Sequence, residues 1–190
     1  RSTLFPYATL FRSKEKDIAF DIIKRLGLLL EKNTKLNVIY TREEDIFIPL
    51  WKRPKIANES NGKVFVSVHL NSNPNKTAYG FETYLLRPGM TEDAIEVASR
   101  ENEVIKLEDR SKNKYQDLSG ENLIMATMAQ SVFMKESEEL AAIIQEEMGK
   151  KVKSRKRGVK QAGFHVLIGA RMPNVLIEAG FLTNANEEKN

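Results

Sequence analysis

The chain has 190 residues, the length of one large domain or two small ones, and 41% of them are hydrophobic, which is enough for a buried core. The 30 basic and 26 acidic residues leave a net charge of +4 with both signs mixed, so the composition does not require a polyanionic partner. Because there is no cysteine, disulfide scaffolds and thiolate metal sites are excluded. No stretch of the sequence is long and apolar enough to predict a membrane span.

The two ends of the chain do not read as intact ends of a domain. Residues 3–13, TLFPYATLFRS, resemble the translation of a widely used sequencing adapter, TLFPYTTLFRS, from which only Ala8 differs. Segments of this kind are set aside before a fold is inferred. We therefore expect residues 1–13 to be non-native, and the native sequence to begin near Lys14 with its upstream part, including any signal peptide, lost. The final letters, NANEEKN, predict the opening of a helix that is cut short.

The first half of the chain predicts two helices and three strands. Apolar residues repeat at helical spacing over 14–33, and NVIY at 37–40 is typical of a short buried strand. A helix is expected from Pro49, a residue favoured in the first turn. The segments KVFVSVHL at 63–70 and GFETYLL at 80–86 predict strands.

The second half continues the alternation of helices and strands. Helical spacing is found over 91–108 and 122–148, whereas GFHVLI at 163–168 and NVLIEAGF at 174–181 predict strands. Near-continuous apolar strands alternating with helices indicate the α/β class. We expect a three-layer αβα sandwich around a mostly parallel, twisted sheet, with an inserted helical segment at 87–139.

Two polar residues stand at the ends of predicted strands, where open α/β sheets bind ligands. His69 ends VFVSVH and Glu178 ends NVLIE. Taken alone, a histidine there is more often a hydrogen-bonded surface residue, and a glutamate can simply reach solvent. Together they indicate a site, because a buried carboxylate is costly unless it is paired, protonated or near a metal. Without thiolates, a transition-metal site must use His, Asp or Glu.

Several blocks of the sequence resemble, in order, the zinc-dependent N-acetylmuramoyl-L-alanine amidases of bacterial cell walls. They are KEKDIAFDIIKRLGLLLEK, VIYTREED, LWKRPKIAN, VFVSVHLNSN, GFETYLL and RGVKQAGFHVLIGARMPNVLIEAGFLTN, of which VSVHLNS and PNVLIEAGFLTN are the specific parts. The resemblance implies an amidase catalytic domain over 14–190, truncated at both ends. It also implies hydrolysis of the amide bond between N-acetylmuramic acid and L-alanine in peptidoglycan, in the periplasm or outside the cell.

The resemblance further implies a Zn²⁺ cofactor held by His, Glu and His. In this sequence the glutamate is Glu15, which without the resemblance is more often a first-turn acid favoured by the helix dipole, and the second histidine is His69. The first histidine belongs upstream of Glu15, where the adapter-like segment stands, and His165 does not match a ligand position. Glu178 is then the general base. A fragment that lacks one zinc ligand is expected to be inactive.

A helical wheel of residues 94–105 places Glu101 in the middle of an apolar face, while Glu96 and Glu103 point away. The apolar residues of that face are Ala94, Val97, Ala98, Val104 and Ile105. A snorkelling or locally paired glutamate, or a rotated helix, would account for this position. The segment including ASRENEVI also resembles the regulatory segment of those amidases in which a helix covers the active site. That resemblance implies that Glu101 is an inhibitory zinc ligand until an activator protein displaces the helix.

Two other classes of function stay open. A non-catalytic cell-wall-binding module on the same fold would result if the first histidine were naturally absent. A nucleic-acid-binding domain is favoured only by the basic run KKVKSRKR at 150–157, which reads as a solvated loop and has no interleaved aromatic residues to stack on bases. The expected partners are therefore peptidoglycan and an activator protein, and not nucleic acid.

Overall fold

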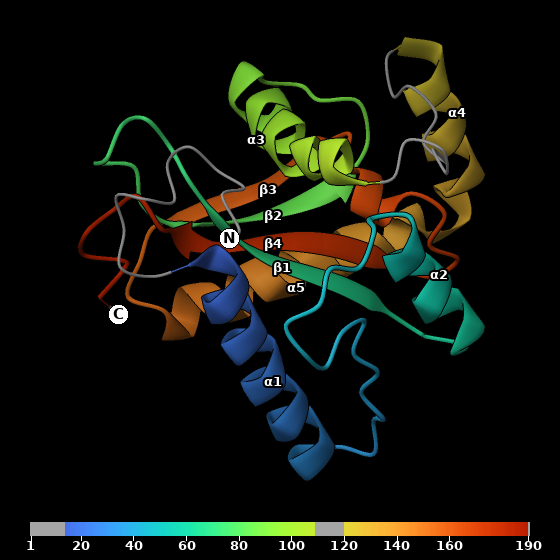
Figure 1. Ribbon diagram of the computed structural model, residues 1–190, viewed down its shortest axis with the longest axis horizontal. Helices are drawn as coiled ribbons and strands as arrows, with labels where there is room; N and C mark the ends of the chain where they lie inside the picture. Colours follow the sequence, from blue (N-terminus) through green and yellow to red (C-terminus); the bar gives the residue numbers. More distant parts are fainter. Residues whose placement is uncertain (1–13, 109–119, 190) are drawn as a thin grey trace.

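A computed structural model describes residues 14–108 and 120–189 of the chain (Figure 1). Its centre is an open four-stranded sheet in the order β1-β4-β2-β3. The strands are β1 (Phe65–Asn71), β2 (Phe81–Leu86), β3 (Lys156–Ala162) and β4 (Asn174–Phe181). β1 pairs with β4 and β2 pairs with β3 in parallel, whereas β2 and β4 are antiparallel. The expected α/β class is confirmed, and two of the three strand pairings are parallel.

Helices cover both faces of this sheet. They are α1 (Glu15–Asn33), α2 (Lys52–Glu59), α3 (Glu92–Asn102), α4 (Gly120–Ala129) and α5 (Met134–Lys151). Short 3₁₀ turns, Glu103–Leu107 and Ser131–Phe133, follow α3 and precede α5. In Figure 1, α5 runs behind the sheet and α3 lies in front of it. The predicted helical segment 87–139 thus contains α3, α4 and the start of α5, and its residues 109–119 lie outside the described part of the chain.

The two faces can be told apart along β4, because successive side chains of a strand point to opposite sides. Leu176 belongs to a core cluster that also contains buried residues of α3, whereas Val175 and Ile177 pack in a second cluster with Ala141 of α5. Glu178 follows the parity of Leu176 and therefore lies on the α3 face. The same alternation puts Ser67, His69, Glu82 and Tyr84 on the α3 face of β1 and β2.

Three predicted elements were wrong. Residues 37–40 do not form a strand; no strand of the described residues pairs with them, and Ile39 is 52% exposed. Residues 163–168 contain the 3₁₀ turn His165–Leu167 instead of a strand, since a short buried apolar run does not by itself distinguish the two. The last residues of the chain form turns and not the start of a helix.

The basic run at 150–157, which reads as a solvated loop, contains the first two residues of β3. This strand lies at the edge of the sheet, where one side of its backbone has no partner strand among the described residues and where Lys156 and Val159 are exposed. Lysines are common on such strands because charge discourages pairing with another chain. A basic edge strand therefore lacks the apolar run by which β1, β2 and β4 could be predicted.

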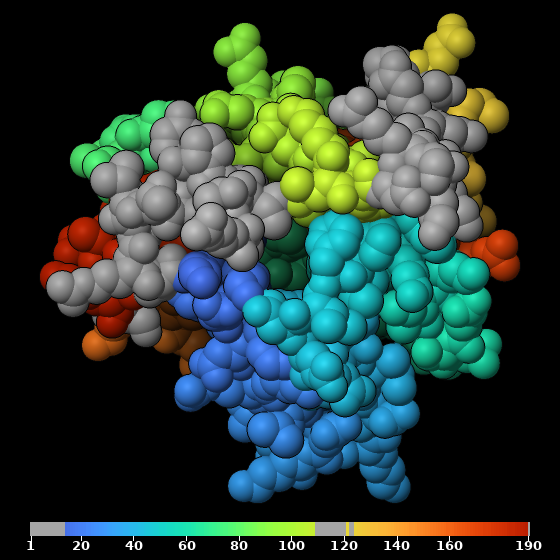
Figure 2. Space-filling model, viewed as in Figure 1, coloured from blue at the N-terminus to red at the C-terminus, as the bar shows by residue number. Residues whose placement is uncertain are grey.

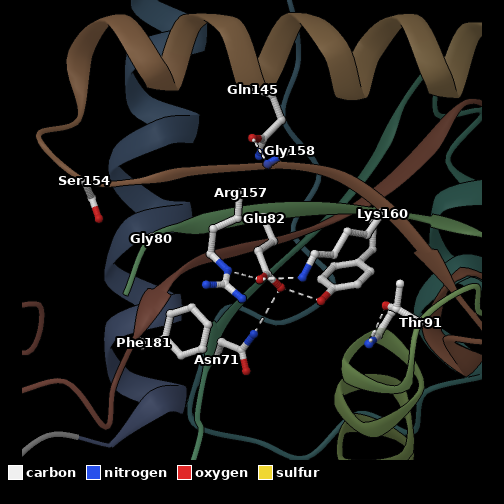
Figure 3. Close-up of polar contacts among 12 residues, drawn as sticks. Asn71, Gly80, Glu82, Thr91, Gln145, Ser154, Arg157, Gly158, Lys160 and Phe181 are labelled. Atoms are coloured by element: carbon white, nitrogen blue, oxygen red, sulfur yellow. Dashed lines mark hydrogen bonds and ion pairs between the residues drawn. The ribbon is translucent and has the colours of Figure 1, made fainter. Parts of the chain in front are cut away.

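A buried carboxylate joins three strands on the α3 face (Figure 3). The side chain of Glu82 on β2 is 1% exposed. Lys160 Nζ of β3 donates to it at 2.8 Å and Asn71 Nδ2 of β1 donates at 3.3 Å, while Arg157 Nε and the Tyr84 hydroxyl also donate. The cluster therefore ties β1, β2 and β3 together at one end of the sheet.

Opposing effects act on the pKa of Glu82. Burial alone would raise the pKa of this carboxyl, because the charged form loses its hydration. The hydrogen bonds from Lys160, Tyr84 and Arg157 outweigh burial and hold the pKa below its ordinary value of 4.5. The ionised carboxylate thus stabilises the folded chain above that ordinary pKa, and this stabilisation is lost as the pH falls through the lower folded pKa.

We therefore expect Glu82→Gln to lower the free energy of unfolding by about 2–4 kcal/mol near pH 7, because it leaves two poorly hydrated cations without their counter-charge. Urea denaturation near pH 7 and again at about pH 3 measures the effect, and the difference from the unchanged chain should shrink at the lower pH. The control is Glu147→Gln, in an exposed pair with Lys150 on α5, which should change stability far less. An equal loss for Glu82→Gln at both pH values would contradict this account.

Candidate functional site

Strand pairing brings three charged residues into one row across the sheet. His69 of β1 is paired in register with Glu178 of β4, and Glu178 is opposite Glu82 of β2. All three point to the α3 face, at the end where β1 and β4 reach their carboxyl ends. His69 and Glu178, which stand at the ends of two strands predicted from the sequence, are thus cross-strand neighbours in a single strand pair.

His69 is the meeting point of three segments that are far apart in the sequence. Its Nδ1 lies 3.1 Å from Glu15 Oε1 at the start of α1 and 2.9 Å from Glu101 Oε2 near the end of α3. Its Nε2 lies 3.1 Å from the Ser67 hydroxyl. In Figure 2 a hollow lies between α1 in blue, the segment before α2 in cyan and α3 in yellow-green. The three side chains are part-buried, with Glu101 at 11% exposure.

Charges dominate the environment of this imidazole. Burial would lower the pKa of His69, but the Glu101 and Glu15 carboxylates outweigh burial and raise it well above its ordinary value. Burial would likewise raise the pKa of Glu101, yet the neighbouring His69 and Arg100 hold it below its ordinary value. Two carboxylates therefore surround one basic nitrogen, and this charge would equally attract a metal cation.

The donor set fits a metal ion in its chemistry. Glu15, His69 and Glu101 each offer one ligand atom, and these atoms all lie within 4.8 Å of one another. Imidazole nitrogen and carboxylate oxygen are both accepted by zinc. The Ser67 hydroxyl is hydrogen-bonded to the other ring nitrogen of His69, Nε2. Metal-binding imidazoles commonly have such a partner, which fixes the orientation of the ring.

Glu178 is the unusual group of the site. Its side chain is 0% exposed, and no described residue donates a hydrogen bond to either carboxylate oxygen. Burial raises the pKa of Glu178 well above its ordinary value, and the Glu101 carboxylate adds to the rise, while His69 opposes it. Most buried polar groups have a hydrogen-bond partner, so an orphaned carboxylate beside a donor cluster marks a candidate acid or base.

Of the histidines and glutamates singled out in the sequence, four lie together in the fold and His165 does not join them. Glu15, His69, Glu101 and Glu178 come together, and the apolar face expected for 94–105 is buried at Ala94, Val97 and Ala98. His165, expected in a strand, lies in a 3₁₀ turn and is not part of the donor group. The first zinc histidine implied upstream of Glu15 would fall outside the described residues.

Sequence reasoning missed the Glu82 cluster. A glutamate in the otherwise largely apolar strand FETYLL could have indicated that Glu82 is buried and paired with cations. Arg157 and Lys160 gave no such signal, because residues three apart in a regular strand point to opposite faces. The pairing shifts register by one residue at this point, and Gly158 has a φ of +88°, so a bulge turns both cations toward Glu82.

Comparisons with known proteins agree with this geometry. The profile of the family described as N-acetylmuramoyl-L-alanine amidase matches residues 8–190, which includes part of the adapter-like segment 3–13. The N-acetylmuramoyl-L-alanine amidase AmiC of Escherichia coli O6:H1 is 32% identical over 183 residues, which are 94% of this chain and 43% of the relative. AmiC of Neisseria meningitidis serogroup B is 31% identical, over 93% of this chain and 42% of the relative. The chain thus spans less than half the length of these two relatives.

Solved structures show the same fold. The N-acetylmuramoyl-L-alanine amidase from Clostridium difficile 630 superposes with a TM-score of 0.64 and 32% identity, covering 93% of this chain and 72% of that one. The CwlD amidase from Clostridioides difficile, solved in complex with the GerS lipoprotein, gives 0.63 and 28%, covering 94% and 76%. None of the helices in the described residues has the length and apolarity needed to cross a bilayer. With a profile match over almost its whole length, the chain belongs to the N-acetylmuramoyl-L-alanine amidase family.

Proposed function

We propose that this chain is the catalytic domain of a zinc-dependent enzyme that hydrolyses the amide bond between N-acetylmuramic acid and L-alanine in peptidoglycan, in the periplasm or outside the cell. The observation that carries the proposal is the orphaned, buried Glu178 carboxylate beside the cluster of Glu15, His69 and Glu101. Family membership supplies the bond that is cut.

Glu15 and His69 would hold the metal, together with a histidine upstream of Glu15. A zinc ion bound there would polarise the scissile carbonyl and lower the pKa of a water molecule toward about 7. Leu70 N, which donates to Glu15 Oε1 at 3.4 Å, and the Ser67 hydroxyl orient the two ligands from the strand.

Glu178 would move the proton. Its carboxylate accepts a proton from the attacking water, whose oxygen adds to the carbonyl carbon. As the carbon–nitrogen bond breaks, Glu178 returns that proton to the amine of L-alanine. The burial that raises the pKa of Glu178 suits this role, because a carboxyl with an ordinary pKa would hold the proton too weakly between the two steps.

We further infer that α3 inhibits the site. Glu101 Oε2 lies 2.9 Å from His69 Nδ1 and would take the position that the water needs. Polar contacts fix the helix on either side of it: Arg100 Nη2 donates to Asn71 Oδ1 and Asn102 Nδ2 donates to the Gly163 carbonyl, both at 2.8 Å. An activator protein would have to displace this helix, and the complex of CwlD with a lipoprotein shows that a related amidase binds a protein partner.

A second candidate is a non-catalytic wall-binding module on the same fold. The observation in its favour is that the donor group of the described residues contains one imidazole only. Release of soluble stem peptide from purified peptidoglycan by a longer form of the protein, which supplies the upstream histidine, distinguishes the two: the enzyme releases it and the module does not.

This 190-residue chain should bind zinc weakly and be inactive. One of its three available donors is Glu101, the proposed inhibitory ligand, and the sequence contains no histidine upstream of Glu15. Elemental analysis after dialysis, together with a peptidoglycan hydrolysis assay, measures both properties. Stoichiometric zinc that survives dialysis would show that the missing ligand has been misjudged.

In the longer form, Glu178→Gln should keep its zinc and lose turnover by about 10²–10⁴-fold, because the amide preserves the shape of the side chain and removes the base. Hydrolysis rate and metal content are measured on the same preparation, with Glu147→Gln on α5 as the control that changes neither. Loss of zinc in Glu178→Gln would make this residue a ligand. Near-normal turnover would remove it from the mechanism.

In the same zinc-loaded form without a partner, Glu101→Ala should raise peptidoglycan hydrolysis by at least about fivefold, since it vacates the position of the water. Glu103→Ala, two residues away and exposed in a pair with Lys106, should leave the rate unchanged. The rates are compared at equal zinc content and equal thermal stability. An unchanged or lower rate in Glu101→Ala under those conditions would rule out autoinhibition by this residue.

A further inference from the structure

A cleft between α3 and the ends of the strands lies beside the proposed active site. Its lining includes Asn71, Asp93, Glu96, Arg100, Arg157 and Lys160. We propose that Arg157 and Lys160 form a subsite for a carboxylate of the peptidoglycan stem peptide, and that α3 closes this subsite in the present structure. The inference rests on the proposed function, and it names the part of the substrate that the enzyme recognises beyond the scissile amide.

The position of the two cations fits the peptide side of the substrate. Glu82, to which both of them bind, is the cross-strand neighbour of Glu178. The cations therefore lie on the side of Glu178 that faces away from His69. Strands are about 5 Å apart, so the cations are roughly 5–10 Å from Glu178, which one to three extended peptide residues can span.

The charge of this cluster is not balanced by its own carboxylate. Glu82 carries one negative charge, whereas Arg157 and Lys160 carry two positive charges. Arg157 uses only its Nε toward Glu82, and no described residue accepts a hydrogen bond from its two terminal nitrogens. The guanidinium also lies 5.1 Å from the centre of the Phe181 ring, which supports its orientation. A planar, oriented guanidinium with free donors is suited to a carboxylate.

A purely structural ion cluster would not need this arrangement. One cation suffices to neutralise a buried carboxylate, and additional charge without a counter-ion costs desolvation free energy. Here a second cation is present and the pair borders a cleft. The extra positive charge is explained if a negatively charged group of the substrate completes the cluster.

α3 supplies negative charge to the same cleft. Asp93 and Glu96 are one turn apart on this helix. Both line the helix side of the cleft, whereas Arg157 and Lys160 line the sheet side. With α3 in place the charged lining consists of three acids and three bases: Glu82, Asp93, Glu96, Arg100, Arg157 and Lys160. Removal of the helix leaves one acid and two bases on the sheet. The helix would therefore compete with the substrate's carboxylate as well as with its scissile amide.

Binding of two small probes to this chain tests the subsite without hydrolysis and without a metal. The probes are N-acetyl-alanyl-glutamate, which mimics the start of the stem peptide, and the same compound with both carboxyls amidated. Calorimetric titration should show at least about fivefold tighter binding of the free acid. Arg157→Gln should abolish this preference, because Lys160 still pairs with Glu82 but the free donors are gone. Arg155→Gln, an exposed cation two residues earlier, should preserve it.

A variant of α3 provides a second test that leaves the buried cluster around Glu82 unchanged. Asp93→Asn combined with Glu96→Gln should tighten binding of the free acid several-fold and leave the diamide unchanged, because the competing charges are removed. Equal affinity of acid and diamide, binding of neither probe to this chain and to the Asp93→Asn, Glu96→Gln variant alike, or an intact preference in Arg157→Gln would each overturn the subsite. If the probes bind as expected while the longer form hydrolyses no peptidoglycan, the subsite stands and the proposed function fails.

Discussion

The burial of the Glu178 carboxylate without a hydrogen-bond donor is the constraint on which the rest of the site depends. Such a group costs several kcal/mol if ionised and alone, so the surrounding structure must compensate for it. On one side lies the imidazole of His69, which favours the ionised carboxylate; on the other lies the cluster around Glu82. The strand that holds Glu178 is anchored by apolar side chains on both faces, such as Leu176 and Ile177. Packing therefore stabilises a position that electrostatics alone would not.

Strand order explains how one carboxylate can serve between two charged clusters. β4 lies between a parallel neighbour, β1, and an antiparallel neighbour, β2. The carboxyl end of β4 therefore meets the carboxyl end of β1 and the amino end of β2. A shift of register by one residue would turn Glu178 to the α5 face, into apolar surroundings. The apolar run Val175–Ile177 fills the core on both faces of β4, and the next residue, Glu178, falls on the α3 face, so the sequence NVLIE specifies the site and the core together.

Much of this could be predicted from the sequence, for identifiable reasons. α1, β1, β2 and β4 have apolar patterns of the right period, and Glu101 was singled out because it interrupts the apolar face of α3. Apolar patterns failed to predict secondary structure where a buried segment is not a regular strand, or where a strand is not apolar. The apolar run at 163–168 is buried as a turn, and the edge strand β3 is mostly polar. The pairing of Arg157 and Lys160 with Glu82 depends on a bulge, which no single-strand periodicity predicts.

The helix that covers the site is attached in a way that suits displacement. α3 buries only Ala94, Val97 and Ala98, whose side chains are small, so the apolar area lost on lifting it is modest. Among its other attachments are two hydrogen bonds to distant parts of the chain, from Arg100 to Asn71 and from Asn102 to the Gly163 carbonyl, which water can replace at small net cost. α5, by contrast, contacts β2, β3 and β4, and its larger side chains Leu140, Ile144 and Met148 pack against the core. The sheet and α5 hold Glu178 and His69 in register independently of α3, which is what the proposed inhibition by a displaceable α3 requires.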